Sequence, residues 1–230
     1  MSKYFLPPGV HFCFRGDAAV FLDEINNKYT LVNAEGYHAL RALTSHGQSD
    51  FSNEIELDAL GTLSRMGLLV RNKHVGREVM PTEVPAPRGE LPLSEGTYSP
   101  IPISTAHVVR FFAACSVAAT QLRWFRIETI LSRVRARKQR HRFSARSDQQ
   151  QAAELAEVFR RLRPLFPRRY LCLFDSFALI EFLSKYHIYP EWVFAVRLEP
   201  WGAHCWVQQD SWTINQDLEE AAGYTPVLAV

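Results

Sequence analysis

The stretch Arg169-Tyr170-Leu171-Cys172-Leu173-Phe174-Asp175-Ser176-Phe177-Ala178-Leu179 decides how the C-terminal half of this 230-residue chain folds. Pro164 and Pro167 close off the helix expected before it, and apolar residues recur at helical spacing after Cys172. The pattern predicts a buried helix that begins at Cys172. At a helix N-terminus the aligned peptide dipoles favour a thiolate, and free N–H groups can hold the oxyanion of an attacked carbonyl. Cys172 is therefore a candidate nucleophile.

Three strands are expected after this helix, over residues 192–198, 203–208 and 212–215. On the second strand His204 shares a face with Trp206, whereas Cys205 points to the other side. A helix with cysteine, then a strand with histidine, then an Asn or Asp is the order used by papain-like and transglutaminase-like sites. The order suits nucleophilic catalysis, because the imidazole takes the thiol proton and a third group fixes the imidazole tautomer.

Three short strands are also predicted in the N-terminal part, over residues 10–15, 18–23 and 28–32. Asn26-Asn27 suits a hairpin turn that needs positive φ, so the strands should form an antiparallel sheet. Asn33 caps a helix that ends at His46-Gly47. A further helix should start near Leu57 and stop at Gly67, followed by a short strand from Leu68.

Strands followed by two helices indicate a winged helix-turn-helix over residues 1–80. Residues 1–100 carry a net charge of −3, and the second helix lacks a cluster of Arg or Lys, so DNA binding is disfavoured. The edge of the sheet can instead accept an extended peptide as an added strand.

Prolines and glycines through residues 81–103 predict an interdomain linker, and residues 104–230 form the second domain of an α+β protein. Residues 101–170 carry a net charge of +11, concentrated in the segment 123–146, whereas residues 171–230 carry −6. The first interpretation of the basic block is a solvated helical face. The alternatives are a site for an acidic partner, a nucleic acid or a nucleotide phosphate. No GxxxxGK phosphate loop occurs, so no cofactor is bound by a recognisable motif.

Composition excludes several classes of protein. Hydrophobic residues make up 47% and charged residues 22%, which is ordinary for a globular chain. No apolar run approaches a membrane span and no signal-peptide core is found, so the expected location is cytoplasmic, with no membrane partner. The four cysteines are scattered without CxxC spacing, which argues against a disulfide framework and against a metal site.

The chain resembles the B proteins of lasso-peptide biosynthesis, which are leader peptidases with a transglutaminase-like fold. The resemblance is carried by the 169–179 stretch, by Gly202-Ala203-His204-Cys205-Trp206-Val207-Gln208 and by the ending Tyr224-Thr225-Pro226-Val227-Leu228-Ala229-Val230. The first eighty residues look like the fused recognition element of such enzymes, similar to the peptide chaperone of pyrroloquinoline quinone synthesis. The resemblance implies an ATP-linked cysteine protease that frees the core peptide for an asparagine-synthetase-like cyclase.

Carried over by motif, Cys172 is the nucleophile and His204 is the base. The family pattern has an Asp directly after the Asn that ends the third strand, whereas here Gln216 follows Asn215 and Asp217 comes next. We favour Asp217 as the third member over Asn215, with Gln216 also open and Asp210 a distant third. The leader is expected along the third N-terminal strand, at Lys28, Tyr29, Thr30, Leu31 and Val32.

Three other functions stay open at this point. A non-catalytic adaptor would use both domains only to bind peptide and partner. An amide-forming transglutaminase would use the same thiol with an amine in place of water as the second nucleophile. A DNA-binding regulator would show duplex affinity that falls steeply with salt.

Overall fold

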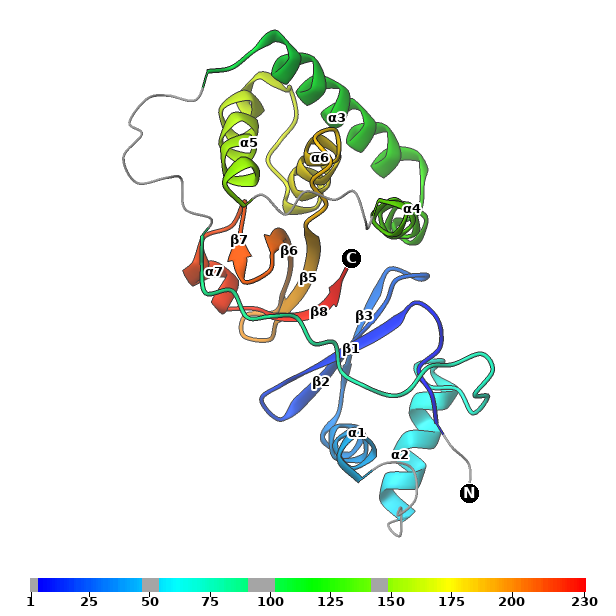
Figure 1. Ribbon diagram of the computed structural model, residues 1–230. Helices are drawn as coiled ribbons and strands as arrows, with labels where there is room; N and C mark the ends of the chain where they lie inside the picture. Colours follow the sequence, from blue (N-terminus) through cyan, green and yellow to red (C-terminus); the bar gives the residue numbers. More distant parts are fainter. Residues whose placement is uncertain (1–3, 47–53, 91–101, 142–148) are drawn as a thin grey trace. The chain divides into compact units, whose positions relative to one another are not determined.

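A computed structural model describes residues 4–46, 54–90, 102–141 and 149–230 (Figure 1). Contacts within the chain group it into two units. The first comprises residues 1–84 with 198–201 and 225–228, and the second comprises the remainder. The middle of the predicted linker, residues 91–101, and the end of the basic segment, residues 142–148, lie outside the described residues.

The first unit is built on a three-stranded antiparallel sheet in the order β1 (Val10–Arg15), β2 (Ala18–Asp23), β3 (Lys28–Val32). These are the strands that alternation predicts. Asn27 adopts a positive φ of 49° in the β2–β3 turn, as the Asn pair indicates. Two helices follow, α1 (Ala34–His46) and α2 (Glu54–Arg65).

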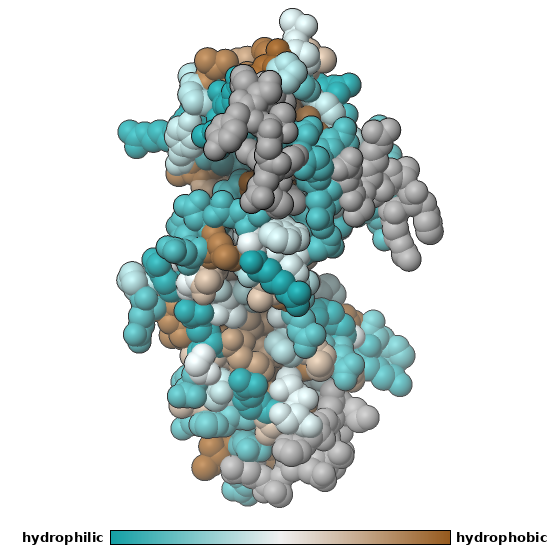
Figure 2. Space-filling model, turned by 60° about the vertical axis from the view of Figure 1, so that its left-hand side comes forward, coloured by the Kyte–Doolittle hydropathy of each residue, from teal (hydrophilic) through white to brown (hydrophobic). Residues whose placement is uncertain are grey.

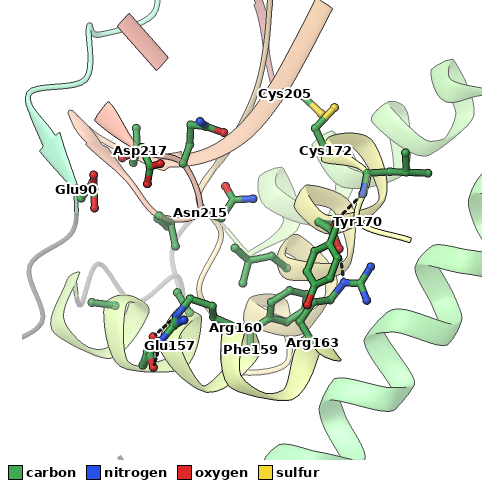
Figure 3. A pocket seen from close by; sticks show the side chains of 18 of the residues that line it. Glu90, Glu157, Phe159, Arg160, Arg163, Tyr170, Cys172, Cys205, Asn215 and Asp217 are labelled. Atoms are coloured by element: carbon green, nitrogen blue, oxygen red, sulfur yellow. Dashed lines mark hydrogen bonds and ion pairs between the residues drawn. The ribbon is translucent and has the colours of Figure 1, made fainter. Parts of the chain in front are cut away.

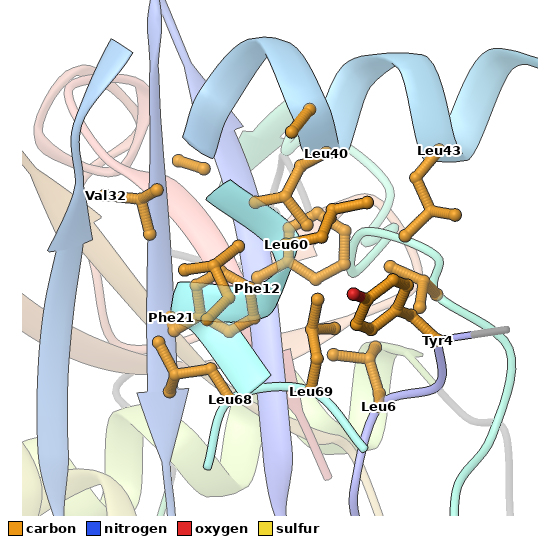
Figure 4. Close-up of a cluster of buried hydrophobic side chains, with 14 of the residues drawn as sticks. Tyr4, Leu6, Phe12, Phe21, Val32, Leu40, Leu43, Leu60, Leu68 and Leu69 are labelled. Atoms are coloured by element: carbon orange, nitrogen blue, oxygen red, sulfur yellow. The ribbon is translucent and has the colours of Figure 1, made fainter. Parts of the chain in front are cut away.

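The two helices and one face of this sheet enclose a hydrophobic core (Figure 4). Phe12 and Phe21 stack at its centre with ring centroids 5.1 Å apart. The strand expected from Leu68 is wrong, because Val70 forms only a single bridge with Phe5 there. The labelled members of the core are Tyr4, Leu6, Phe12, Phe21, Val32, Leu40, Leu43, Leu60, Leu68 and Leu69.

The second unit combines helices with a mixed sheet. The longer helices are α3 (Thr105–Trp124), α4 (Ile127–Arg140), α5 (Gln149–Leu162) and α6 (Cys172–Ser184), with a 3-10 turn at Arg163–Leu165 and a short α7 (Leu218–Ala222). The sheet order is β4 (Gly89–Glu90), β7 (Trp212–Thr213), β6 (Gly202–Gln209), β5 (Glu191–Arg197), β8 (Thr225–Ala229).

Helix α6 is central to this unit, since it packs against α3, α5 and β6. Phe177 on α6 stacks on Trp192 of β5 with ring centroids 5.2 Å apart. Both side chains are fully buried. Every residue of α6 from Phe174 to Leu183 except Asp175 is buried, so the apolar spacing in the sequence correctly predicts a core helix.

One local expectation needs correction, and it concerns the strand predicted over residues 212–215. The predicted third strand is reduced to Trp212–Thr213, since the side chain of Asn215 takes the hydrogen bond from Val207 that a strand carbonyl would accept. The Ile214 amide still donates to the Val207 carbonyl at 2.9 Å, so the chain leaves the sheet only after this residue.

Apolar side chains on the surface include residues of α3. Figure 2 shows hydrophilic residues over most of the face drawn, with hydrophobic side chains at the top and in further groups lower down. Val109 and Trp124 of α3 are 67% and 74% exposed. Across the described ranges, no helix has the length and apolar character needed to cross a membrane.

Candidate active site

The first turn of α6 places Cys172 at the start of a helix. Leu171 is the N-cap and supplies no side-chain cap. The Leu171 amide instead donates to Asp175 Oδ2 at 2.7 Å. A carboxylate in the first turn of the helix therefore accepts the hydrogen bond of the N-cap amide. The Cys172 side chain is exposed, and the first amides of a helix have no acceptor within it. The geometry needed to stabilise an oxyanion is therefore available beside the sulfur.

Arg163 holds the segment that leads into this helix. Its side chain is 3% exposed, and its Nε donates to Asp175 Oδ1. The same guanidinium donates to the carbonyls of Phe166, Arg168 and Arg169 at 3.0–3.2 Å. A buried guanidinium needs such partners for its five donors. Arg163 thus fixes the loop and the helix to each other immediately before the sulfur.

His204 enters the site from β6, where it pairs with Ala195 of β5. The structure brings Cys172 and His204 into hydrogen-bond contact. Hydrogen bonds from the side chains of Cys205 and His204 lower the pKa of Cys172 to about 4 from the usual 9.0, against the opposing effect of burial. The contact with Cys172 also raises the pKa of His204. The favoured state is a thiolate facing an imidazolium.

Cys205 belongs to the site although its sequence position suggested the other face of the strand. Its side chain is buried and hydrogen-bonds to Cys172, and its amide also donates to that sulfur. The same contact, together with burial, raises the pKa of Cys205 well above its ordinary value. Cys205 therefore stays protonated, and its S–H group donates a hydrogen bond to the neighbouring thiolate. The sequence offers no signal for this role, because a buried strand cysteine is ordinarily a small apolar residue.

Gln216 is the residue that contacts the Nε2 atom of the His204 ring. His204 Nε2 and Gln216 Oε1 are 2.5 Å apart, and the Nε2 of Gln216 donates to Glu220 Oε2. Asp217, the residue favoured from the sequence, is the exposed N-cap of α7, and Gln216 takes the ring nitrogen in its place. Asp210 instead accepts a hydrogen bond from Gln149, at the turn after β6.

Asn215 ties the same segment to the rest of the domain. Its Oδ1 accepts from the Val207 amide at 2.7 Å, and its Nδ2 donates to Ser176 Oγ at 3.2 Å. Ser176 is fully buried on α6 and donates to the Cys205 carbonyl at 3.1 Å. Asn215 therefore links β6, α6 and the loop, and both ends of its amide are used in this link.

An open cleft of about 770 Å³ surrounds these groups (Figure 3). Cys172, His204, Cys205, Asn215, Gln216 and Asp217 all line it. Tyr170 and Leu171, directly before the nucleophile, are 65% and 54% exposed and supply apolar surface. Glu157 and Arg160 form an ion pair on the α5 side (Figure 3). The volume is in the range of small-molecule and peptide side-chain sites.

In the ranges 4–46, 54–90, 102–141 and 149–230, no group of three or more His, Cys, Asp or Glu side chains could hold a metal ion. Two cations of the basic helix α4 form ion pairs with other elements of the same unit. Arg137 pairs with Glu181 of α6 at 2.8 Å, and Lys138 pairs with Glu191 of β5. These ion pairs attach α4 to its neighbours.

An acidic thiol at a helix start and an imidazole on an adjacent antiparallel strand define a class of site suited to nucleophilic acyl transfer. The model of the transglutaminase-like superfamily matches residues 114–229, just over half of the chain. The chain therefore belongs to this superfamily, which includes cysteine proteases and acyltransferases. None of the curated proteins and none of the solved structures compared with the chain matches it.

Proposed function

We propose that the protein is a leader peptidase of lasso-peptide biosynthesis, which binds the leader of a ribosomally made precursor and cuts the chain directly after it. The observation that carries the proposal is the pairing of an acidic Cys172 with His204 in an open cleft. Cleavage frees the N-terminal amine of the core for ring closure by an asparagine-synthetase-like cyclase. In this proposal the ATP requirement belongs to that partner.

The reaction follows from the two side chains. The Cys172 thiolate attacks the scissile carbonyl, and a C–S bond forms while the first amides of α6 hold the oxyanion. The tetrahedral intermediate then loses the core amine, which takes its proton from the His204 imidazolium. The neutral imidazole next removes a proton from water, and the resulting hydroxide attacks the thioester. The leader leaves as a carboxylic acid and Cys172 is regenerated.

Leader binding is assigned to the first unit, as a winged-helix recognition element. Strand β3 ends the sheet order, so its outer edge can pair with an extended peptide. Leu31 is 57% exposed, whereas Val32 is packed in the core, so Val32 offers only its main chain. Beside β3 lies a hollow of about 590 Å³, which suits an apolar leader side chain. Its lining residues are Tyr29, Leu31, Leu198, Glu199 and Trp201.

The proposed cleavage is tested by incubating the protein with the short peptides encoded beside its gene and measuring the masses of the products by mass spectrometry. Hydrolysis gives two fragments whose masses sum to the precursor plus one water. Cys172→Ala and His204→Ala should each abolish cleavage, whereas Cys13→Ala, which alters a buried thiol of the first unit, should retain it. A crosslinked product that has lost ammonia would indicate the amide-forming alternative. Cleavage that survives Cys172→Ala would disprove the proposal.

The recognition part is tested by leader affinity. Leu31→Glu should weaken binding of a fluorescent leader peptide by about 10-fold, because a charge replaces apolar contact worth ~1–2 kcal/mol at the edge. Ile25→Glu is the matched control, since Ile25 is 41% exposed in the turn before β3. Equal affinities for the two variants would place the leader elsewhere. Unchanged binding by Cys172→Ala separates recognition from chemistry.

A further inference from the structure

Two consecutive hydrogen bonds connect His204 to Gln216 and Gln216 to Glu220. His204 Nε2 lies 2.5 Å from Gln216 Oε1, and Gln216 Nε2 lies 2.5 Å from Glu220 Oε2. An imidazolium has N–H donors on both nitrogens, so the nitrogen at Gln216 donates to the amide oxygen. The carboxylate accepts from the amide nitrogen and thereby fixes which end of the amide faces the ring. The order is ring, amide, carboxylate.

The backbone is anchored on both sides of Gln216, whose side-chain amide lies between His204 and Glu220. Directly before it, Asn215 is bonded to the Val207 amide of β6 and to Ser176 of α6. Two residues after it, the Leu218 amide donates to Glu90 Oε1 at 3.3 Å, which anchors the start of α7. A side chain between two anchored points loses less conformational entropy when it forms its hydrogen bonds.

The charges around His204 give this order a consequence. Cys172 of α6 and Glu220 of α7 are the acidic groups that act on the ring and raise the pKa of His204. The ring of Tyr224 lies 5.2 Å from the imidazole, and Arg197 of β5 lies over that tyrosine. Gln216 itself is uncharged. Glu220 is therefore the carboxylate whose charge reaches His204 from the side opposite the thiol.

We propose that Gln216 orients His204 and that Glu220 is a positioning residue acting through it, so that this site replaces the directly bonded carboxylate of a Cys-His-Asp triad by an amide with a carboxylate behind it. The inference rests on the proposed use of Cys172 and His204, but it concerns their ion pair and not the substrate.

The first test measures how fast iodoacetamide alkylates Cys172 as a function of pH, site by site by peptide mass spectrometry. Glu220→Gln removes the charge and keeps the shape, so the thiolate–imidazolium pair weakens and the midpoint moves to higher pH. On the acid limb the rate should fall about 3–10-fold, which corresponds to about half to one pH unit. Glu219→Gln is the matched control, because it makes the same charge change on the same short helix at an exposed position. Superimposed profiles for the two variants would overturn the proposal.

The second test asks whether Glu220 acts through Gln216. In a Gln216→Ala background the additional change Glu220→Gln should have a smaller effect, because only the through-space action of the charge remains once the connecting amide is gone. An undiminished effect would mean that Glu220 acts directly, and would refute the relay.

The double variant Q216E/E220Q reverses the order of amide and carboxylate while keeping the net charge. It should restore the acid limb at least to the wild-type position, since a carboxylate now faces the ring. A profile like that of Gln216→Ala would count against the proposal. Thermal melting of each variant shows whether it is folded. Slow alkylation of Cys172 in the wild type would instead disprove the nucleophile, so the two failures are distinguishable.

Discussion

Cys13 and Cys172 are the same side chain in opposite chemical states. Cys13 lies on β1 in the first unit, 2% exposed, and burial raises its pKa to about 12. Cys172 begins α6 in the second unit, and hydrogen bonds from Cys205 and His204 lower its pKa to about 4. The presence of donors around the sulfur, and not hydrophobicity alone, decides whether a cysteine is inert or reactive.

Strand and helix provide donors differently. On β1 the main influence on the Cys13 thiol is burial, which the charge of Arg15 offsets only in part. A helix start leaves its first amides without acceptors within the helix, and the neighbouring strand β6 adds the amide of Cys205. The reactive cysteine thus lies where the start of helix α6 meets strand β6.

The largest expected effect is in alkylation rate. At pH 7 a thiol of pKa about 12 is ionised in about one molecule in 10⁵, whereas Cys172 is fully ionised. An acidic thiolate is less nucleophilic, which offsets about 10³–10⁴-fold of this difference, so acidity alone should make Cys172 react about 10- to 100-fold faster than Cys13. The burial of Cys13 should slow its reaction further. The rates are read by mass spectrometry of labelled peptides.

Lowering the pH sharpens this comparison. Between pH 7 and pH 5 the thiolate of Cys13 falls a further ~100-fold while Cys172 stays ionised, so the ratio of rates should rise by that factor. A ratio that is constant with pH would show that accessibility, and not acidity, separates the two thiols.

A smaller effect is expected from loosening the helix start. Arg163→Ala leaves the Asp175 carboxylate and three carbonyls without their shared donor, and should lower the free energy of unfolding by ~3–5 kcal/mol, measured by urea titration. Arg160→Ala removes an arginine that is 75% exposed in its pair with Glu157, and should cost at most ~1 kcal/mol. Equal losses would show that the buried network does not hold the site together.

The smallest effect is expected at Cys205. Cys205→Ala removes one donor from the Cys172 thiolate and should shift the acid limb of its alkylation profile to higher pH by a few-fold in rate. A thiol is a weak donor, and the ring of His204 and the amide at position 205 remain. Cys205→Ser should restore part of the loss. A change as large as that of His204→Ala would move the main source of acidity to Cys205.

Much of the fold could be predicted because it depends on local periodicity. The strands β2 and β3 follow from two runs on either side of a turn with an Asn pair, and the start of α6 follows from helical spacing and proline positions. The end of the third C-terminal strand could not be predicted, because the side chain of Asn215 replaces a strand carbonyl at Val207. Such a substitution depends on a contact between segments and leaves no periodic signal.

The site divides in the same way. Cys172 and His204 are found from the order of elements, and the structure brings them together. Which of residues 215–217 meets the ring depends on how the chain leaves β7, so Gln216 could not be distinguished from Asp217. Arg163 is one of five arginines between residues 160 and 169, and no local pattern indicates which one is buried.

The guanidinium of Arg163 has a consequence for how the second unit folds. It joins the end of α5 to the loop of residues 166–169 and to Asp175 in a single network. The loop cannot reach its final path before both helices have docked, so the nucleophile should acquire its acidity late in folding and lose it early in denaturant. Local opening of this network would then make the thiol unreactive at denaturant concentrations below those that unfold the rest of the unit and expose its peptide bonds to proteolysis.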